Sequence, residues 1–376
     1  MISNISILTN EEMIFRTNEA FPSLRKDFYK VYVLTCTFNQ SSFIEDCLDG
    51  VAKQKTNFPF VHHVVDDAST DGEQRVINSW MEKECDLETK ECYDNEVCSV
   101  VIAKLKNNAN CTVVFYFLKK NMYGNPKKQE LYLPWREVCP YEALCEGDDY
   151  WLDENKLQKQ YDWLEEHPEY SMCWHDAYVD ENGKKNPYDR YKTDCDVPFV
   201  DLVMKGGAFC PSASLFFRHS CFFDYLNKVK ENNLSFYVGD YPIQMYMGHV
   251  GKVRYMKDPM CVYRVFSNGS WTQKVKSLSK EDKVKFWDKE HQLLMNMNVL
   301  TDHKYEHLFE QRWYLYAFRV NCMEKFYDEA EHFYGLLDEK LKRDNLLAFR
   351  MIGMGCPKLG WVTNKLVTLK NLVFRK

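Results

Sequence analysis

Short apolar runs alternate with amphipathic stretches along the first part of the chain. The apolar runs, typical of buried strands, lie at residues 31–34, 61–65, 113–118 and 141–145. The amphipathic stretches, typical of helices, lie at 43–51, 76–80, 131–138 and 153–167. This alternation favours β-α-β units, so we expect an α/β fold with a mostly parallel central sheet flanked by helices.

The pattern changes in the second half. Short strands are predicted at 171–175, 215–217, 253–256 and 260–265, with a helix at 243–249. From about Ser279, apolar residues repeat at helical spacing, which predicts a helical C-terminal region. We expect an N-terminal extension at 1–28, an α/β domain at 29–275 and the helical region at 276–376.

Two polar stretches interrupt this pattern. Residues 82–110 are charged and contain several cysteines, and we expect a helical insertion or a variable loop without a chemical role. Residues 184–197 hold few apolar side chains and many Tyr, Asp and Lys, which suits a mobile loop over a site.

Polar side chains follow three of the predicted strands. Thr37, Phe38 and Asn39 follow the first strand, residues 66–72 follow the second, and residues 146–151 follow the run at 141–145. The carboxyl ends of parallel strands form the edge at which open α/β sheets bind ligands. Oxygen ligands on a tight loop suit Mg²⁺ or Mn²⁺, which can neutralise a diphosphate. A solvated turn that caps the next helix is the alternative for an isolated Asp-Asp pair.

Three further segments carry open alternatives. The basic loop 119–128 contacts a diphosphate or is simply solvated. The small-residue stretch 206–214 lets a ligand approach closely or is a plain loop. Asp240 is the N-cap of the helix at 243–249 or a general base.

Composition narrows the function class. The 376 residues suffice for one large core or two domains, and the formal charge of −6 gives no argument for nucleic acid binding. The 15 cysteines are scattered without paired metal-site spacing, so we expect reduced thiols in a cytosol. The first 18 residues do not resemble a signal peptide, and no apolar stretch is long enough to span a membrane.

The last twenty residues have their own character. Leu359, Val362, Leu366, Leu369 and Val373 form a narrow apolar stripe, and the charged residues from 357 onward are all basic. Such a helix lies on an anionic membrane surface or docks on the same or another subunit, and both interpretations stay open.

Together these motifs resemble glycosyltransferase family 2, the inverting enzymes of GT-A fold. The resemblance covers roughly residues 29–271 and rests on Thr37-Phe38-Asn39, on the segments 64–72 and 146–151, and on Gly239-Asp240-Tyr241-Pro242 with Tyr263-Arg264. Two positions depart from the usual family pattern. Glu146 stands where the family often has Asp, and Gly239 stands where an acidic residue often precedes the base.

The resemblance implies a role for each matched position. Thr37, Phe38 and Asn39 would line the nucleotide pocket, with Phe38 near the base. The polar roles would fall to Asp67 at the base, Asp148 at the ribose or sugar, Asp149 at Mn²⁺ or Mg²⁺, Arg264 at the diphosphate, and Asp240 as the base that deprotonates the acceptor.

The resulting hypothesis is an inverting, metal-dependent transfer of a sugar from a nucleotide-diphosphate donor to a saccharide or lipid-linked acceptor. The resemblance favours a UDP-sugar and surface polysaccharide synthesis, in the cytoplasm or peripherally at the inner face of the membrane. A homo-oligomer stays open. One alternative is a nucleotidyltransferase, which would normally place a Gly- and Arg-rich loop where Thr37 to Gln40 stand. The other is a non-catalytic carbohydrate-binding or scaffold relative, which predicts loss of the site carboxylates.

Overall fold

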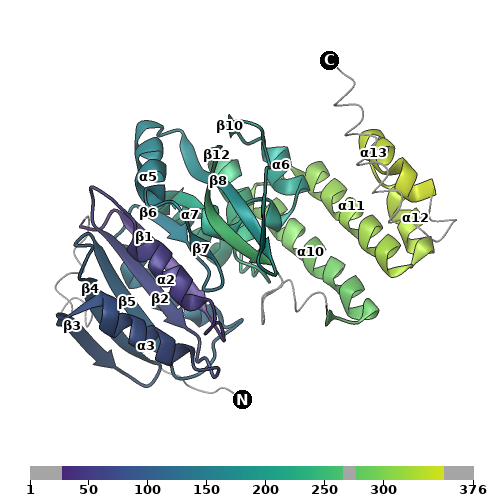
Figure 1. The fold of residues 1–376 in the computed structure, drawn as a ribbon. Coiled ribbons are helices and arrows are strands. Elements are labelled where there is room, and N and C mark those ends of the chain that lie inside the picture. The colour runs from purple at the N-terminus through teal and green to yellow at the C-terminus, as the bar shows by residue number, and fades with distance from the viewer. Residues whose placement is uncertain (1–27, 266–276, 351–376) are drawn as a thin grey trace.

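The computed structural model describes residues 28–265 and 277–350 (Figure 1). Within these ranges, twelve strands form one sheet, with ten of them in the order β10-β12-β8-β11-β6-β1-β2-β5-β4-β3. Strand β7 pairs with β12, and β9 pairs with β8. The predicted N-terminal extension and the basic tail lie almost wholly outside the described residues.

The centre of the sheet is parallel, as predicted. It consists of β6 (Tyr141–Leu144), β1 (Val31–Thr37), β2 (Phe60–Asp66) and β5 (Cys111–Leu118). All seven residues of β2 are buried. A strand that is covered on both faces has a nearly continuous apolar sequence, because its side chains are buried on both sides. The sequence pattern therefore located these four strands.

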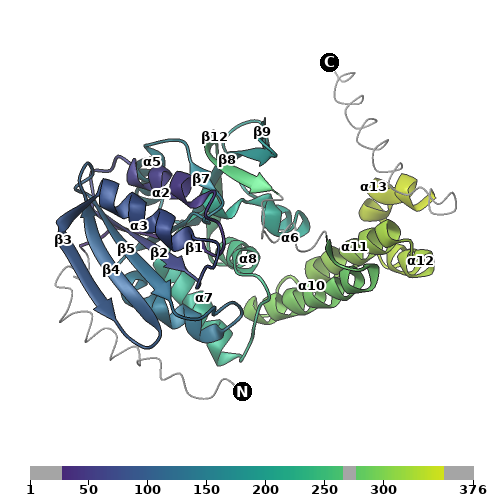
Figure 2. The same ribbon diagram turned by 60° about the horizontal axis from the view of Figure 1, so that its bottom comes forward.

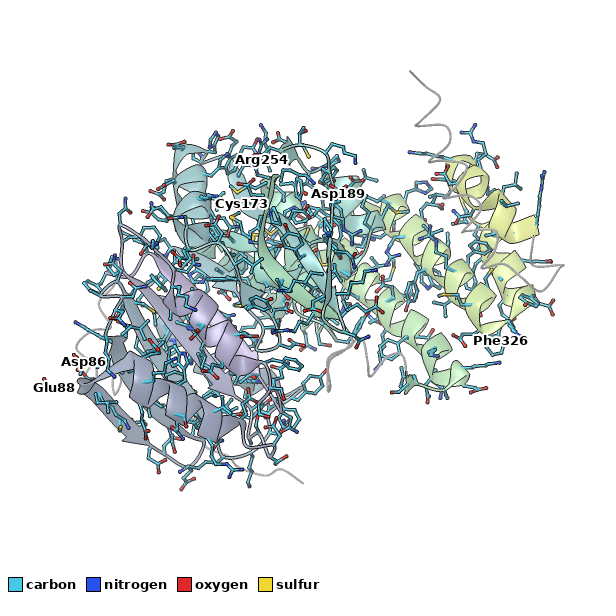
Figure 3. The ribbon with its side chains drawn as sticks, in the orientation of Figure 1. Asp86, Glu88, Cys173, Asp189, Arg254 and Phe326 are labelled. Atoms are coloured by element: carbon cyan, nitrogen blue, oxygen red, sulfur yellow. The ribbon has the colours of Figure 1, made fainter. Side chains whose placement is uncertain are left out.

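Residues 82–110 do not form a helical insertion or a loop, and that prediction was wrong. After α3 (Glu73–Glu84), strands β3 (Cys85–Asp94) and β4 (Cys98–Leu105) form an antiparallel hairpin that extends the sheet beyond β5. Figure 3 shows Asp86 and Glu88 at the outer edge of the sheet. Charged side chains on an edge strand prevent pairing with other chains, and they also conceal the strand from pattern analysis.

The other flank is mixed. Strands β11 (Phe216–Arg218), β8 (Tyr170–Glu181) and β12 (Lys252–Val265) continue the sheet beside β6. Two separate strands were expected within 253–265, but β12 is one long strand with irregular register around Pro259. The stretch 184–197 is not wholly a loop, because it contains β9 (Lys184–Pro187), which pairs with β8, and β10 (Cys195–Asp196), which pairs with β12. The short β7 (Tyr150–Trp151) pairs with β12.

Helices cover both faces of the parallel strands. Helices α2 (Ile44–Ala52), α3 and α5 (Lys156–Glu166) pack on one face, where Val31 and Val33 of β1 contribute to the core. Figure 1 shows α2 and α3 side by side over this face. The 3₁₀ helix η1 (Pro126–Leu131) and α4 (Leu133–Arg136) pack on the other face against Tyr32 and Leu34.

A second group of helices joins the sheet to the helical C-terminal region. Helices α6 (Phe199–Met204), α7 (His219–Glu231) and α8 (Asp240–Val250) share one core with β8 and with α10 (Lys280–Leu300). The sequence analysis missed α6 and α7. Helices α11 (Glu306–Glu324), α12 (Tyr327–Gly335) and α13 (Glu339–Arg350) follow, and Figure 2 shows them extending away from the sheet.

Two chain-wide properties complete the description. In the described ranges, no helix is both long and apolar enough to cross a membrane. The fourteen cysteines of these ranges are all free thiols.

Candidate active site

The loops after β1 and β2 lie side by side at the carboxyl edge of the sheet. The two strands end in register, with Thr37 opposite Asp66. The backbone N–H of Asp67 then donates to the carbonyl of Thr37 at 3.0 Å. The parallel register therefore brings the predicted residues of both loops to one place.

The acidic loop after β6 joins them through a glycine. Beyond β6, the N–H of Gly147 donates to the carbonyl of Cys36 at 3.2 Å, so the chain keeps following β1. A Cβ atom at Gly147 would lie 2.4 Å from the hydroxyl oxygen of Thr37 and 2.4 Å from Oε1 of Gln40. Only glycine lets the backbone of this loop come so close to the end of β1.

A buried glutamate that the sequence analysis missed ties the first two loops together. Glu73, at the start of α3, is fully buried and accepts hydrogen bonds from Thr37, from the N–H of Gln40 at 2.9 Å and from the hydroxyl of Ser69 at 2.8 Å. Burial raises the pKa of Glu73. In sequence, an acid in the first turn of a helix indicates no more than a favourable helix dipole interaction.

Asn39 and Phe38 differ in what they offer a ligand. Asn39 has a φ of +56°, donates its N–H to Ser69 Oγ at 2.9 Å and accepts the N–H of Thr70 on Oδ1 at 2.7 Å. Its side chain thus holds the loop after β2. The Phe38 ring is 38% exposed at the strand end, so its face is available for stacking against a planar group.

Asp67 is buried and holds a lysine. One of its oxygens accepts the N–H of Met122 at 2.6 Å, and the other pairs with Nζ of Lys128 at 2.8 Å. The positive charge of Lys128 also acts against the rise in the pKa of Glu146, so the lysine lies near the acidic loop as well. Lys128 belongs to the basic loop 119–128, whose role the sequence left open.

Asp149 and Arg264 are bonded to each other, but through the backbone of the arginine. The N–H of Arg264 donates to Oδ1 of Asp149 at 2.8 Å. Its guanidinium donates to the carbonyl of Asp148 at 2.8 Å and pairs with Asp46. The predicted diphosphate-binding arginine is therefore held by protein groups beside the acidic loop.

Five acidic or phenolic groups influence one another across the site. Loss of hydration, together with the negative charges of Asp148 and Asp240, raises the pKa of Glu146 to about 8. Burial and the charges of Asp149, Asp240 and Asp148 raise the pKa of Tyr263. Asp240 therefore faces the loop that carries the Asp-Asp pair, although 91 residues separate it from Asp149.

Asp240 begins α8. Loss of hydration raises the pKa of its carboxyl to about 6, against the effect of hydrogen bonds from its own N–H and that of Tyr241. A carboxylate whose pKa lies close to neutral pH suits general base catalysis. The helix is held in turn by Gln244, whose side-chain amide donates to the carbonyls of Gly207 and Cys210 at 3.2 and 3.0 Å.

The acidic loop fits a divalent cation. Asp149 is buried, and its Oδ2 has no hydrogen-bond partner. Burial and the charge of Asp148 raise the pKa of Asp149 well above its usual range, which a cation would reverse. No group of three or more His, Cys, Asp or Glu in residues 28–265 and 277–350 is arranged to hold a metal ion on its own. A site of one or two carboxylates completed by substrate phosphates needs no such group.

Comparison with known proteins agrees with this architecture. The model of the family described as glycosyl transferase family 2 matches residues 32–129. Uncharacterised proteins of Mycobacterium bovis and Mycobacterium tuberculosis are 26% identical over 278 residues, which cover 72% of this chain and 67% of each relative.

Two crystal structures of S. aureus TarS have the same fold. The longer one has a TM-score of 0.50 and 16% identity over 89% of this chain and 54% of TarS, so our chain spans about half of its length. A fragment of residues 1–349 has a TM-score of 0.50 and 15% identity, over 91% of this chain and 92% of the fragment. Residues 32–129 thus match glycosyl transferase family 2, and the chain as a whole has the GT-A fold.

Proposed function

We propose that the protein transfers a sugar from a UDP-sugar to a hydroxyl group of a saccharide or lipid-linked acceptor, with inversion at the anomeric carbon. One observation carries the proposal. Asp240, with its pKa raised to about 6, faces the acidic loop at the edge where the loops after β1 and β2 converge. This arrangement supports a site at which a base acts beside a nucleotide pocket.

The nucleotide lies against the ends of β1 and β2 in this proposal. The exposed ring of Phe38 stacks on the base, and Thr37 and Asn39 shape the pocket floor through their loop contacts. Asp67 accepts a hydrogen bond from the base, because a carboxylate that already has two partners still has free lone pairs. Lys128 holds that buried carboxylate in place through their ion pair.

The diphosphate lies over the acidic loop. Asp149, with Asp148 beside it, would hold Mn²⁺ or Mg²⁺, which stabilises the negative charge of the leaving diphosphate when bound. Asp148 also faces the ribose or the sugar. Arg264 adds a positive charge next to this loop, where it favours the same leaving group.

Asp240 acts on the acceptor. Its carboxylate takes the proton of the acceptor hydroxyl while that oxygen forms a bond to the anomeric carbon and the nucleotide diphosphate departs from the opposite face. Attack opposite the leaving group inverts the configuration. The protonated Asp240 is stable enough to form because loss of hydration already disfavours its charged state.

The biological setting is part of the proposal. Synthesis of a surface polysaccharide at the cytosolic face of the membrane would bring a lipid-linked acceptor to the enzyme. The basic tail, which lies outside the described residues, would contribute to membrane contact in this setting.

The test is a panel of UDP-glucose, UDP-N-acetylglucosamine and GDP-mannose, assayed for binding and for slow hydrolysis with Mn²⁺ or Mg²⁺. We expect one donor to stabilise the wild type in a metal-dependent way, and Asp149→Asn to abolish that dependence. Asp240→Asn should keep donor binding and lose at least about 90% of hydrolysis, which is the usual scale of general base effects. Asp258→Asn, at an exposed position of β12, is the matched control.

Binding of no nucleotide under either metal would refute the donor site and favour the carbohydrate-binding alternative. Release of a nucleoside monophosphate and a sugar 1-phosphate, instead of a nucleoside diphosphate and a free sugar, would favour the nucleotidyltransferase.

A further inference from the structure

A buried ion pair joins the first two helices of the C-terminal region. Glu290 of α10 is 4% exposed and Arg312 of α11 is 9% exposed. Nη2 of Arg312 donates to Oε1 of Glu290 at 2.8 Å. Charged groups are seldom buried without a specific role, because their loss of hydration must be offset by close partners.

The partners of this pair are two tyrosines on either side of Asp240. The hydroxyl of Tyr237 donates to Oε2 of Glu290 at 3.0 Å. The Nε of Arg312 donates to the hydroxyl of Tyr241 at 3.4 Å. Both oxygens of the glutamate and two nitrogens of the guanidinium, Nε and Nη2, are thereby used. The segment between the two tyrosines contains Asp240.

The same arginine reaches the small-residue loop on the other side of α8. A Cβ atom at Gly206, whose φ is +80°, would lie 2.9 Å from Nη2 of Arg312. The hydroxyl of Tyr241 donates to the carbonyl of Val203 at 2.5 Å, at the end of α6. Arg312 thus fixes Tyr241 against the loop that begins at Gly206.

We propose that the Glu290–Arg312 pair positions the catalytic base, so that the helical C-terminal region is part of the active site. The inference rests on the proposed role of Asp240. Tyr241 directly follows Asp240 in the first turn of α8, so a displaced Tyr241 changes the direction of the base. Glu290 and Arg312 are positioning residues, because they reach Asp240 only through the two tyrosines.

The pair should affect turnover and not donor binding. The nucleotide pocket lies at the ends of β1 and β2, whereas the hydrogen bonds of Glu290 and Arg312 within the described residues go to each other and to Tyr237 and Tyr241. The opposite charges of the pair cancel, and the groups that govern the pKa of Asp240 do not include either of them. A loss of the pair therefore acts on geometry.

The first experiment needs no turnover. Hydrogen exchange of the peptide 234–242 is measured in the wild type, in Tyr241→Phe and in Arg312→Met, with no ligand present. We expect faster exchange in both variants. In Arg312→Lys the rate should lie between those of the wild type and Arg312→Met, because a lysine keeps the positive charge but lacks the planar guanidinium that donates to two partners at once. Matched controls are Tyr314→Phe on α11, whose ring contacts Trp313 and Phe333, and Arg343→Met at an exposed position of α13.

The second experiment measures UDP affinity and hydrolysis of the best donor among UDP-glucose, UDP-N-acetylglucosamine and GDP-mannose. Tyr241→Phe should leave UDP affinity within about twofold and lower kcat about tenfold, equivalent to one misplaced catalytic group. Unchanged exchange and unchanged kcat in a folded Arg312→Met protein would overturn the inference. If Asp240→Asn itself keeps full activity, the proposed function fails, whereas the exchange result still shows whether the pair holds this segment.

Discussion

Gly147 and Thr37 are in contact at the point where the acidic loop passes the end of β1. A side chain at 147 would place its Cβ 2.4 Å from the threonine hydroxyl and against Oε1 of Gln40. We therefore expect Gly147→Ala to lower the free energy of unfolding by about 1–3 kcal/mol, the usual result of overpacking, and to weaken UDP binding. Urea unfolding and calorimetric titration with UDP measure the two effects.

Gly335→Ala is the control for this prediction. Gly335 ends α12, and a Cβ atom there would have no neighbour within 4 Å, so the substitution should change neither quantity. Equal stability of the Gly147→Ala protein and the wild type would show that the loop moves away without strain.

Lys128 supplies the only cationic partner of the Asp67 carboxylate that the described residues show. Replacing it with methionine leaves a buried carboxylate with a single backbone donor. Lys128→Met should therefore cost about 3 kcal/mol of stability, as expected when one member of a buried pair is removed. Nucleotide affinity should fall as well, since Lys128 would no longer hold the Asp67 carboxylate in place. Lys127→Met, at the exposed neighbouring position, should leave both unchanged; an equal loss in the two variants would contradict the specific pairing.

The pH dependence of turnover should report Asp240. Since its pKa is about 6, the base is ionised above that pH and protonated below it. Donor hydrolysis should therefore be constant above about pH 7 and fall about tenfold for each pH unit below about 6. Asp240→Asn should remove this acidic limb together with most of the activity. An acidic limb that persists with the same midpoint in the residual activity of Asp240→Asn would assign it to another group.

Buried histidines should make the fold sensitive to acid. Burial lowers the pKa of His62 to about 3, and its Nδ1 has no hydrogen-bond partner. Between about pH 6.5 and 3 the unfolded chain binds a proton at this position that the folded chain does not, so stability falls as the pH falls. The contribution is up to about 1.4 kcal/mol per pH unit.

Urea unfolding at several pH values between about 7 and 4 tests this linkage. His62→Gln should show a smaller loss of stability per pH unit than the wild type. His332→Gln, at an exposed position of α12, should keep the wild-type slope. Identical slopes in all three proteins would mean that other groups cause the acid sensitivity.

The parallel strands were predictable because their burial on both faces leaves continuous apolar runs, as in 61–65 of β2. The hairpin β3–β4 was not, because its edge strand carries charged side chains such as Glu88 and Lys90 at positions that pattern analysis assigns to solvent. Polar and less polar residues alternate along β3 as in a strand, but its many charged residues led to the prediction of a helix or a loop. Helix α7 lies between a short strand and a polar loop, and its amphipathic pattern was overlooked.

The candidate site, like the fold, was only partly predictable from the sequence. The positions of Asp67, Asp149 and Asp240 in their loops follow from local motifs. Their partners do not, since Lys128 and Arg264 are 61 and 115 residues from the carboxylates they meet. Such pairings depend on the strand order, and spacing along one sequence contains no information about it.

The contact between Arg312 and the loop at Gly206 has a consequence for protein engineering. Grafting the helices after residue 275 onto another member of the family would separate Arg312 from Tyr241 and from the glycine that makes room for it. A chimera that keeps the contact must exchange residues 199–350 as one block. Recombination of these enzymes, whether in the laboratory or between genomes, should succeed more often at the boundary before α6 than at the boundary before α10.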